Sequence, residues 1–396
     1  MTTPLANLRV LDASRVLAGP FCGQMLGDLG AEVIKLERPG TGDDTRGWGP
    51  PFAGGFSAYF LSCNRNKRSL TLDISRPEGV AILDRLLASS DVLIENFRSD
   101  SAEKLGLGAE QLLKRHPRLI ICSISGFGRT GPMNEIPGYD FAIQAMSGLM
   151  AITGPKEGPP FKVGVAVTDI LTGLHSAVAI LACLRARESS GHGYSIDMSL
   201  LDCAIASQVN VASAYLISGV MPARQGNAHL QIVPYQLFAT QDGWMVLNVG
   251  NDGQWQHFCS AAQRPDLAQD ARFTTNRLRV THREELIPLI ETLFKELTTQ
   301  EWQSRLSADR VPHAMVWDYP ELFRQEQIRA REMKITIRDP QGKEVDFVGS
   351  PFHIEGTSRP EPRFPPDLGE DNEEILRDLL GLDPAEIEKL KAGKIV

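Results

Sequence analysis

Short apolar runs alternate with helical segments through the first two hundred residues of the chain. Apolar runs bounded by turn residues predict strands, and the amphipathic or proline-initiated segments between them predict helices. The predicted strands are residues 8–11, 32–36, 70–72, 92–95 and 119–124, and the predicted helices are 21–29, 77–88 and 109–115. This order is typical of a parallel sheet with helices packed on it, whose ligands bind beside the carboxyl ends of the strands.

The chain changes character after about residue 200. The later segments are a helical stretch at 200–217, a linker at 220–228, a hairpin of 236–240 with 244–249, helices around 254–262, 283–297 and 299–308, strands at 335–337 and 344–348, and helices at 370–380 and 384–391. The predicted fold class is α/β, with a Rossmann-like parallel-sheet large domain plus a smaller α/β domain. We expect the large domain over residues 1–200 and 325–396, the small one over 225–324, and a linker helix and loop over 201–224.

The composition fits a soluble globular protein. Of 396 residues, 42% are hydrophobic and 23% charged, and the net charge of −8 argues against nucleic-acid binding. The six cysteines show no C-x-x-C pair or zinc spacing and are expected to be reduced, buried thiols of a cytoplasmic protein. The first residues do not read as a signal peptide, and the longest apolar run, near 174–184, is expected to be too short and too polar to span a membrane.

One glycine-rich segment matches a nucleotide-binding pattern without its structural context. Residues 126–131, Gly-Phe-Gly-Arg-Thr-Gly, fit the G-x-G-x-x-G fingerprint of dinucleotide-binding enzymes. The fingerprint works when its third glycine opens a helix that receives a pyrophosphate, whereas Pro132, Asn134 and Pro137 follow here. We therefore interpret the segment as a mobile loop over a site. The eight histidines are dispersed, so no metal site is expected.

Asp169 is the one ionisable residue between Val163 and Leu174, a stretch that is otherwise small or apolar. Residues 163–167 predict a short buried strand, and the apolar residues from Ile170 onward repeat at helical spacing. Asp169 is therefore expected at a strand-to-helix junction. It is either the N-cap of the helix or a nucleophile that the helix dipole keeps ionised, and the local pattern leaves both interpretations open.

Several longer motifs follow one another along the chain. They lie at residues 11–20, 30–40, 42–46, 64–69, 95–98, 138–140, 162–174 and 366–370. In this order they resemble the class III coenzyme A transferases, the family that includes formyl-CoA transferase, carnitine CoA-transferase and the α-methylacyl-CoA racemases. The resemblance covers almost the whole chain. Within the family it is most similar to the succinate–hydroxymethylglutarate (dicarboxylate) CoA-transferases, notably across residues 42–52 and 226–238.

The resemblance implies covalent acyl transfer on Asp169. In the family, the matching aspartate attacks an acyl-CoA thioester to give a mixed anhydride, which the CoA thiolate converts into an aspartyl-CoA thioester. The acceptor carboxylate reverses the sequence, so no metal or cofactor is expected, and coenzyme A is carried as a substrate. We expect succinyl-CoA as the donor and a dicarboxylic acid as the acceptor. Loops 126–131 and 226–234 are expected to be lids that exclude water.

The resemblance also implies binding residues. Those expected along the CoA path are Val16, Leu17, Ala18, Arg38, Leu72, Asn96, Phe97, Arg98 and Lys104. Those expected around the acyl group and the nucleophile are Trp48, Tyr59, Tyr139, Asp140, His229 and Gln231. Asp140 either tunes Asp169 through like-charge repulsion or only caps a helix. Arg65, Lys67 and Arg68 form the densest basic cluster in the chain. A solvated turn explains this cluster almost as well as a binding role does.

Two departures from relatives narrow the function. The racemases have Gly-His-Asp where this chain has Gly138-Tyr139-Asp140, so the imidazole used in racemisation is missing. The formyl-CoA transferases carry glycines where this chain has residues 229–234. A CoA-transferase is the preferred function, with an α-methylacyl-CoA racemase or a non-catalytic acyl-CoA-binding protein as alternatives. The resemblance further implies an interlocked homodimer with acyl-CoA and carboxylic acid substrates, and no nucleic-acid or membrane partner.

Overall fold

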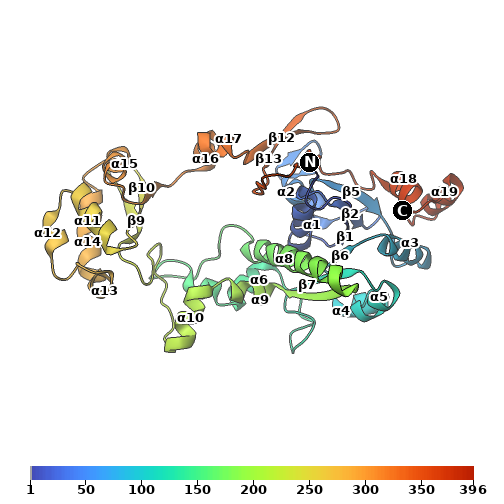
Figure 1. Cartoon of the computed structure of the whole chain (residues 1–396), viewed down its shortest axis with the longest axis horizontal. Helices are drawn as coiled ribbons and strands as arrows, with labels where there is room; N and C mark the ends of the chain where they lie inside the picture. Colours follow the sequence, from blue (N-terminus) through green and yellow to red (C-terminus); the bar gives the residue numbers. More distant parts are fainter. Residues whose placement is uncertain (1) are drawn as a thin grey trace. The chain divides into compact units, whose positions relative to one another are not determined.

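The computed structural model describes residues 2–396, and all side chains among them except those of residues 99–101 (Figure 1). The chain divides into two compact units. The first unit comprises the chain up to Leu149, Val163–Val209 and Glu326–Val396, and the second comprises Met150–Lys162 and Asn210–Gln325. Asp169 lies in the first unit, together with all of the proposed binding residues except His229 and Gln231.

A six-stranded sheet with entirely parallel pairing forms the centre of the first unit. In spatial order its strands are β5 (Lys67–Thr71), β2 (Glu32–Glu37), β1 (Arg9–Ala13), β6 (Val92–Glu95), β7 (Ile120–Ser125) and β8 (Tyr194–Ser199). The predicted parallel sheet is confirmed, and so are the five strands expected before residue 125. The edge strand β8 was not predicted, because its exposed positions, Ser195 and Asp197, interrupt its apolar residues.

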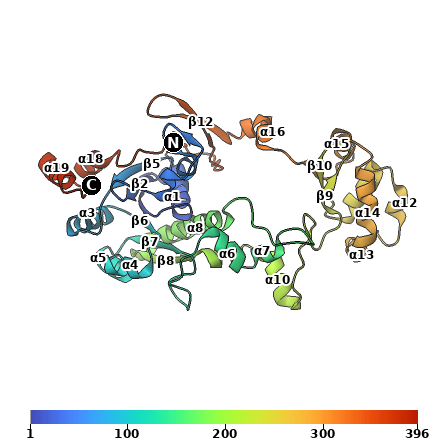
Figure 2. The same ribbon diagram turned by 180° about the vertical axis from the view of Figure 1, so that it is seen from behind.

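Helices cover both faces of this sheet because successive strand residues point to opposite sides. Val10 of β1 belongs to the core beneath α1 (Ala18–Asp28), α8 (Val167–Ser190) and α9 (Leu200–Ala206). Leu11 belongs to the core beneath α3 (Pro77–Ala88), α5 (Ala109–Arg115) and the C-terminal helices. In both views α8 runs beside α1 (Figure 2).

The expected strand at residues 163–167 is wrong. These residues are irregular up to Val167, where α8 begins, and Val165 is 52% exposed. Their backbone is bonded elsewhere, since the N–H of Val163 donates to the Gln144 side-chain oxygen and the N–H of Val167 donates to the carbonyl of Val165. Asp169 is consequently the third residue of the helix rather than its N-cap, which is Ala166.

Helix α8 also corrects the expectation about its length. It has 24 residues, and an 18-residue window within it has a mean hydropathy of 1.7, so by length and composition alone it could cross a membrane. The prediction that this run is too short and too polar is wrong because the helix starts before Ile170 and continues to Ser190. Within the first unit, Thr172, Ser176 and Ile180 are buried against the core beneath α1.

The remaining elements of the first unit surround the sheet. They are η1 (Asp44–Gly47), β3 (Phe52–Ala53), β4 (Phe56–Ser57), α2 (Ala58–Cys63), α4 (Ser99–Lys104), α6 (Asp140–Met146), α17 (Glu326–Ala330), β12 (Lys334–Arg338), β13 (Glu344–Val348), α18 (Asn372–Glu374), η2 (Ile375–Leu379) and α19 (Pro384–Ala392). The two predicted strands, β12 and β13, are confirmed, and they pair antiparallel. The six cysteines are free thiols, as expected, and only Cys183 is partly exposed.

The second unit is built around a three-stranded antiparallel sheet in the order β11 (His313–Met315), β10 (Trp244–Asn248) and β9 (Tyr235–Ala239). Its helices are α10 (Val209–Ser218), α11 (Asp252–Ala261), α12 (Pro265–Gln269), α13 (Asn276–Thr281), α14 (Arg283–Phe294), α15 (Thr299–Ala308) and α16 (Tyr319–Arg324), and α7 (Leu149–Ile152) precedes them in the chain. Phe294 stacks on Phe238 and Trp302 in the core. The single helix expected over 200–217 is instead interrupted between α9 and α10, where the Gln208 side chain bonds the carbonyl of Ser147.

Candidate active site

Three carboxylates at the carboxyl ends of strands, Asp12 of β1, Glu37 of β2 and Glu95 of β6, have basic partners. Lys67 Nζ lies 2.8 Å from Asp12, Arg46 Nη2 lies 2.6 Å from Glu37, and Arg129 pairs with Glu95. Burial opposes ionisation of Asp12 and Glu37, but the neighbouring cations hold the pKa of each below its ordinary value. All three carboxylates are thus ion-paired at this end of the sheet, and burial raises the pKa of Glu95 despite its pairing with Arg129.

Asp169 differs from these three carboxylates. Among the described side chains, which exclude those of residues 99–101, none ion-pairs with its carboxylate or donates a hydrogen bond to it. Burial, and then the negative charge of Asp140, raises the pKa of Asp169 from 3.8 to about 7. Burial and the charge of Asp140 thus act against the ionisation that a helix start favours. A carboxylate with a perturbed pKa and no partner is a candidate nucleophile.

Asp140, the first residue of α6, holds the start of α8. Its carboxylate accepts hydrogen bonds from the Thr168 N–H (2.9 Å), the Thr168 hydroxyl (2.8 Å) and the Gln144 amide (2.8 Å). The side-chain oxygen Oε1 of Gln144 accepts from the N–H of Val163 at 2.8 Å, which fixes the segment that enters the helix. Both interpretations of Asp140 therefore hold together, since it caps α8 from a neighbouring helix and repels the charge of Asp169.

The loop before Asp140 is closed by two glycines. A Cβ atom on Gly126 would lie 2.6 Å from the Cα of Gly138, so the two backbones can touch only where both residues lack a side chain. No helix opens at Gly131, which confirms that the segment is not a dinucleotide fingerprint. Arg129 ties the loop down, because its N–H donates to Asp197 at 2.9 Å. A lid function for this loop stays a prediction.

Aromatic residues approach the nucleophile from α2 and the preceding loop. Burial, and then the charge of Asp169, raises the pKa of the Tyr59 hydroxyl to about 12. The Trp48 ring meets Tyr59 edge-on, with 5.2 Å between centroids. Tyr139, next to Asp140, is 67% exposed. The structure thus brings Tyr59 and Trp48 together with the Asp140–Asp169 pair in one part of the first unit.

The residues expected along the CoA path follow the carboxyl ends of four adjacent strands. They are the turn Val16–Ala18 after β1, Arg38 after β2, Leu72 after β5 and Asn96–Arg98 after β6, with Lys104 at the end of α4. The side chains of Arg38, Arg98 and Lys104 are exposed, whereas Leu72 is buried in the core and Phe97 packs against it. The placement agrees with a ligand at this end of the sheet, and contact with CoA stays a prediction.

His229 and Gln231 belong to the second unit. The His229 ring lies edge-on to Tyr235, and its Nδ1 accepts from the Gln231 N–H at 3.0 Å. The backbone of this segment is held by Arg283, which donates to the carbonyl of His229 at 2.8 Å. Their role in recognising a carboxylate therefore stays a prediction.

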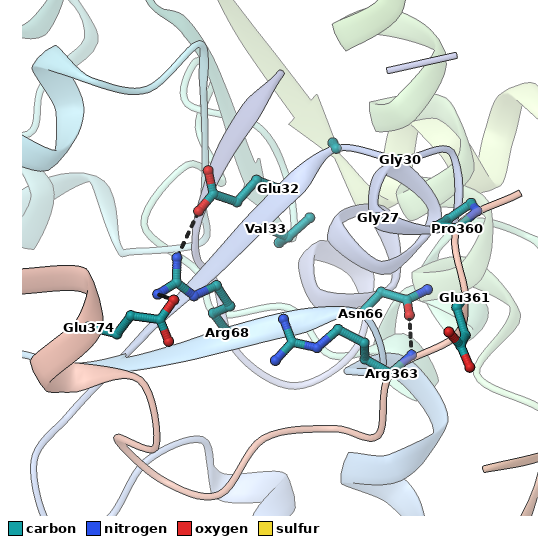
Figure 3. Close-up of a pocket in the computed structure, with 11 residues that line it drawn as sticks. Gly27, Gly30, Glu32, Val33, Asn66, Arg68, Pro360, Glu361, Arg363 and Glu374 are labelled. Carbon is teal, nitrogen blue, oxygen red and sulfur yellow. Dashed lines mark hydrogen bonds and ion pairs between the residues drawn. The ribbon is translucent and has the colours of Figure 1, made fainter. Parts of the chain in front are cut away.

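A pocket of about 390 Å³ lies at the opposite, amino-terminal ends of β2 and β5 (Figure 3). Arg68 faces Glu32 and Glu374 across it, and the charges largely neutralise one another. The interpretation of the basic cluster as a solvated turn is wrong, because Arg65 pairs with Asp28 and Lys67 with a buried carboxylate. Among the described side chains, which exclude those of residues 99–101, no three His, Cys, Asp or Glu residues are grouped to hold a metal ion.

Three residues of the site were not found from the sequence. Thr168 and Gln144 act through Asp140, and neither forms part of a motif that signals such a contact. Lys35 is fully buried in β2, and its Nζ lies 2.9 Å from the buried carboxylate of Asp43. A lysine inside the apolar run Val33-Ile34-Lys35-Leu36 was a usable signal, because a buried ammonium requires a partner.

Comparison with known proteins gives consistent matches over the whole chain. A model of CoA-transferase family III matches residues 5–372. The chain is 42% identical to the succinyl-CoA:glutarate CoA-transferase of Mus musculus, covering 99% of this chain and 90% of that protein. It is also 42% identical to the succinate–glutarate CoA-transferase of Agrobacterium fabrum, covering 95% and 96%. The crystal structure of a CAIB/BAIF family protein from Brucella suis superposes with a TM-score of 0.85 at 43% identity, covering 96% and 100%.

Proposed function

Because the chain belongs to CoA-transferase family III, we propose that it moves coenzyme A from succinyl-CoA to a dicarboxylic acid such as glutarate, with Asp169 as the nucleophile. The assignment of Asp169 rests on one observation. Its carboxylate has no cation partner among the described residues, whereas Asp12 and Glu37 at the sheet end each have one. The substrates are proposed from the two relatives, whose names specify succinyl-CoA or succinate together with glutarate.

The proposed reaction needs only carboxylate and thiolate nucleophiles. The Asp169 carboxylate attacks the thioester carbonyl, the C–S bond breaks, and CoA leaves as a thiolate. The thiolate then attacks the Asp169 carbonyl of the anhydride, releasing the donor acid and leaving an aspartyl-CoA thioester. The acceptor carboxylate displaces the thiolate, which attacks the acceptor's carbonyl and frees Asp169. No net proton transfer occurs, and positioning with exclusion of water supplies the catalysis.

The start of α8 offers one backbone donor for the oxyanion of each tetrahedral intermediate. The N–H of Val167 bonds the carbonyl of Val165, and the N–H of Thr168 bonds Asp140. The N–H of Asp169 has no acceptor among the described residues. A free donor beside the reacting carboxyl supports stabilisation of the negative charge that develops there.

We also propose that the enzyme is a homodimer. In the first unit, Phe141 and Met146 on α6 and Val178 on α8 are each more than half exposed, and in the second unit Leu216 and Ile217 on α10 are at least four-fifths exposed. Exposed apolar groups of this extent are typical of surfaces that a partner covers. Sedimentation equilibrium should give twice the chain mass, and a monomer would contradict the proposal.

The transferase proposal is tested by incubating the purified protein with succinyl-CoA and a panel of mono- and dicarboxylates. We expect glutaryl-CoA or a related dicarboxyl-CoA to form, and Asp169→Asn to abolish its formation without abolishing CoA binding. Hydroxylamine added during turnover should convert Asp169 alone into a hydroxamate, which peptide mass spectrometry locates. Deuterium uptake from solvent at the α carbon without an acceptor would instead indicate a racemase.

A further inference from the structure

The turn between β1 and α1 holds Val16 in a conformation that valine avoids. Its φ is +72°, in the left-handed region where a β-branched side chain is strained. Such strain persists only where the surrounding contacts enforce it, and it is common at ligand-binding segments. The contacts that enforce it here are specific.

Ser14, Arg15 and Val16 of this turn are each bonded from outside the turn. Lys35 Nζ donates to the carbonyl of Ser14 at 3.1 Å. Asn96 accepts from the N–H of Arg15 at 3.0 Å and donates to its carbonyl at 2.9 Å. The N–H of Val16 lies 3.3 Å from both carboxylate oxygens of Asp43. The left-handed peptide at Val16 thus depends on Asp43.

Asp43 is itself fixed in place. Lys35 Nζ lies 2.9 Å from its Oδ2, and both side chains are fully buried. Its Oδ1 accepts from the N–H of Thr45 at 3.0 Å and from the Thr45 hydroxyl at 2.8 Å. A buried ion pair adds little to stability compared with apolar residues of the same size, so its value lies in fixing geometry.

The turn lies beside the nucleophile. A Cβ atom on Gly173, one turn of α8 after Asp169, would lie 2.8 Å from the carbonyl oxygen of Ala18, so α8 packs directly on the first residues of α1. Tyr59 experiences the charges of both Asp169 and Asp43. The conformation of the turn therefore shapes the space in front of Asp169.

We propose that Asp43, locked by Lys35, is a positioning residue that holds the Val16 turn in its left-handed conformation and thereby preforms the surface that binds acyl-CoA. This inference rests on the transferase function proposed above. Without the acceptor at Asp43, Val16 relaxes to an ordinary conformation, and the turn that fits acyl-CoA becomes a minor state. The apparent affinity for acyl-CoA is then the intrinsic affinity multiplied by the fraction of molecules whose turn is still left-handed.

The test is a double-mutant cycle between the ion pair and the strained residue. Lys35→Met with Asp43→Ala removes both charges together, so no unpaired charge is left buried. This pair of changes should raise the KM for succinyl-CoA about tenfold or more, with a smaller effect on kcat. In a Val16→Gly background the same pair should raise KM about threefold or less, because glycine adopts positive φ without strain. Lys35→Met with Asp43→Asn retains an oxygen acceptor and should recover most of the loss.

The matched control is Asn7→Gly, at another left-handed position outside the site (φ +67°). In that background the pair of changes should raise KM as much as in the wild type. If the pair of changes raised KM as much in the Val16→Gly background as in the wild type, the effect would be a general destabilisation and the proposal would be overturned. Calorimetric Kd values for CoA are measured alongside. A wild type that binds CoA but transfers none would refute the transferase function while the Kd cycle still tests the turn, and a wild type that binds no CoA would overturn both.

Discussion

Replacing Asp169 with asparagine should stabilise the protein, and the gain should grow with pH. Burial and Asp140 raise the pKa of Asp169 from 3.8 to about 7, so the folded state binds its proton more tightly than the unfolded state does. The resulting destabilisation is absent below about pH 4, grows as the pH rises, and is complete above about pH 7. A pKa change of this size corresponds to roughly 4 kcal/mol, and partial exposure of the side chain reduces it to about 2–4 kcal/mol.

Thermal melting at pH 5 and pH 8 measures this effect. For a chain of 396 residues, the expected gain at pH 8 corresponds to an increase in Tm of about 2–5 °C for Asp169→Asn, with a smaller gain at pH 5. Asp202 provides the matched control, because it is also the third residue of a helix, α9, but is exposed. Asp202→Asn should give no such gain. If Asp169→Asn were neutral or destabilising at pH 8, the assignment of a raised pKa would be refuted.

Three further predictions concern the surroundings of the nucleophile. The kcat/KM for acyl transfer should rise with pH to a plateau, with a midpoint at an apparent pKa of about 7. Asp140→Asn should move this midpoint to lower pH, because it removes the negative charge that repels Asp169, and an unmoved midpoint would contradict the coupling of the two residues. Gly126→Ala should lower kcat about tenfold or more, because the new methyl group displaces Gly138 and the start of α6; steady-state kinetics on folded protein checks this. Lys67→Met should destabilise the fold by about 3–5 kcal/mol in urea unfolding, because it leaves a buried carboxylate unpaired.

The strands and helices were predictable where the pattern follows from local burial. The strands β1, β2, β6 and β7 are buried on both faces and therefore read as apolar runs. In β8, partly buried residues alternate with exposed polar ones, and this strand was missed. The environment of Asp169 was not predictable in the same way. It depends on Asp140, and nothing within residues 163–174 indicates that a second carboxylate caps the helix from α6.

The raised pKa of Asp169 has a consequence for the proposed chemistry. Burial and Asp140 disfavour the ionised carboxylate, but the anhydride and the thioester formed on it carry no charge at that position. Each acylation in the proposed reaction therefore removes both the repulsion by Asp140 and the desolvation cost. The free energy that raises the pKa of Asp169 thus also favours the covalent intermediates over the free carboxylate, by roughly the same amount. A cation beside Asp169, like those beside Asp12 and Glu37, would stabilise the carboxylate and oppose acylation. This accounts for an unpaired aspartate at the start of α8, while Asp12 and Glu37 at the sheet end are paired.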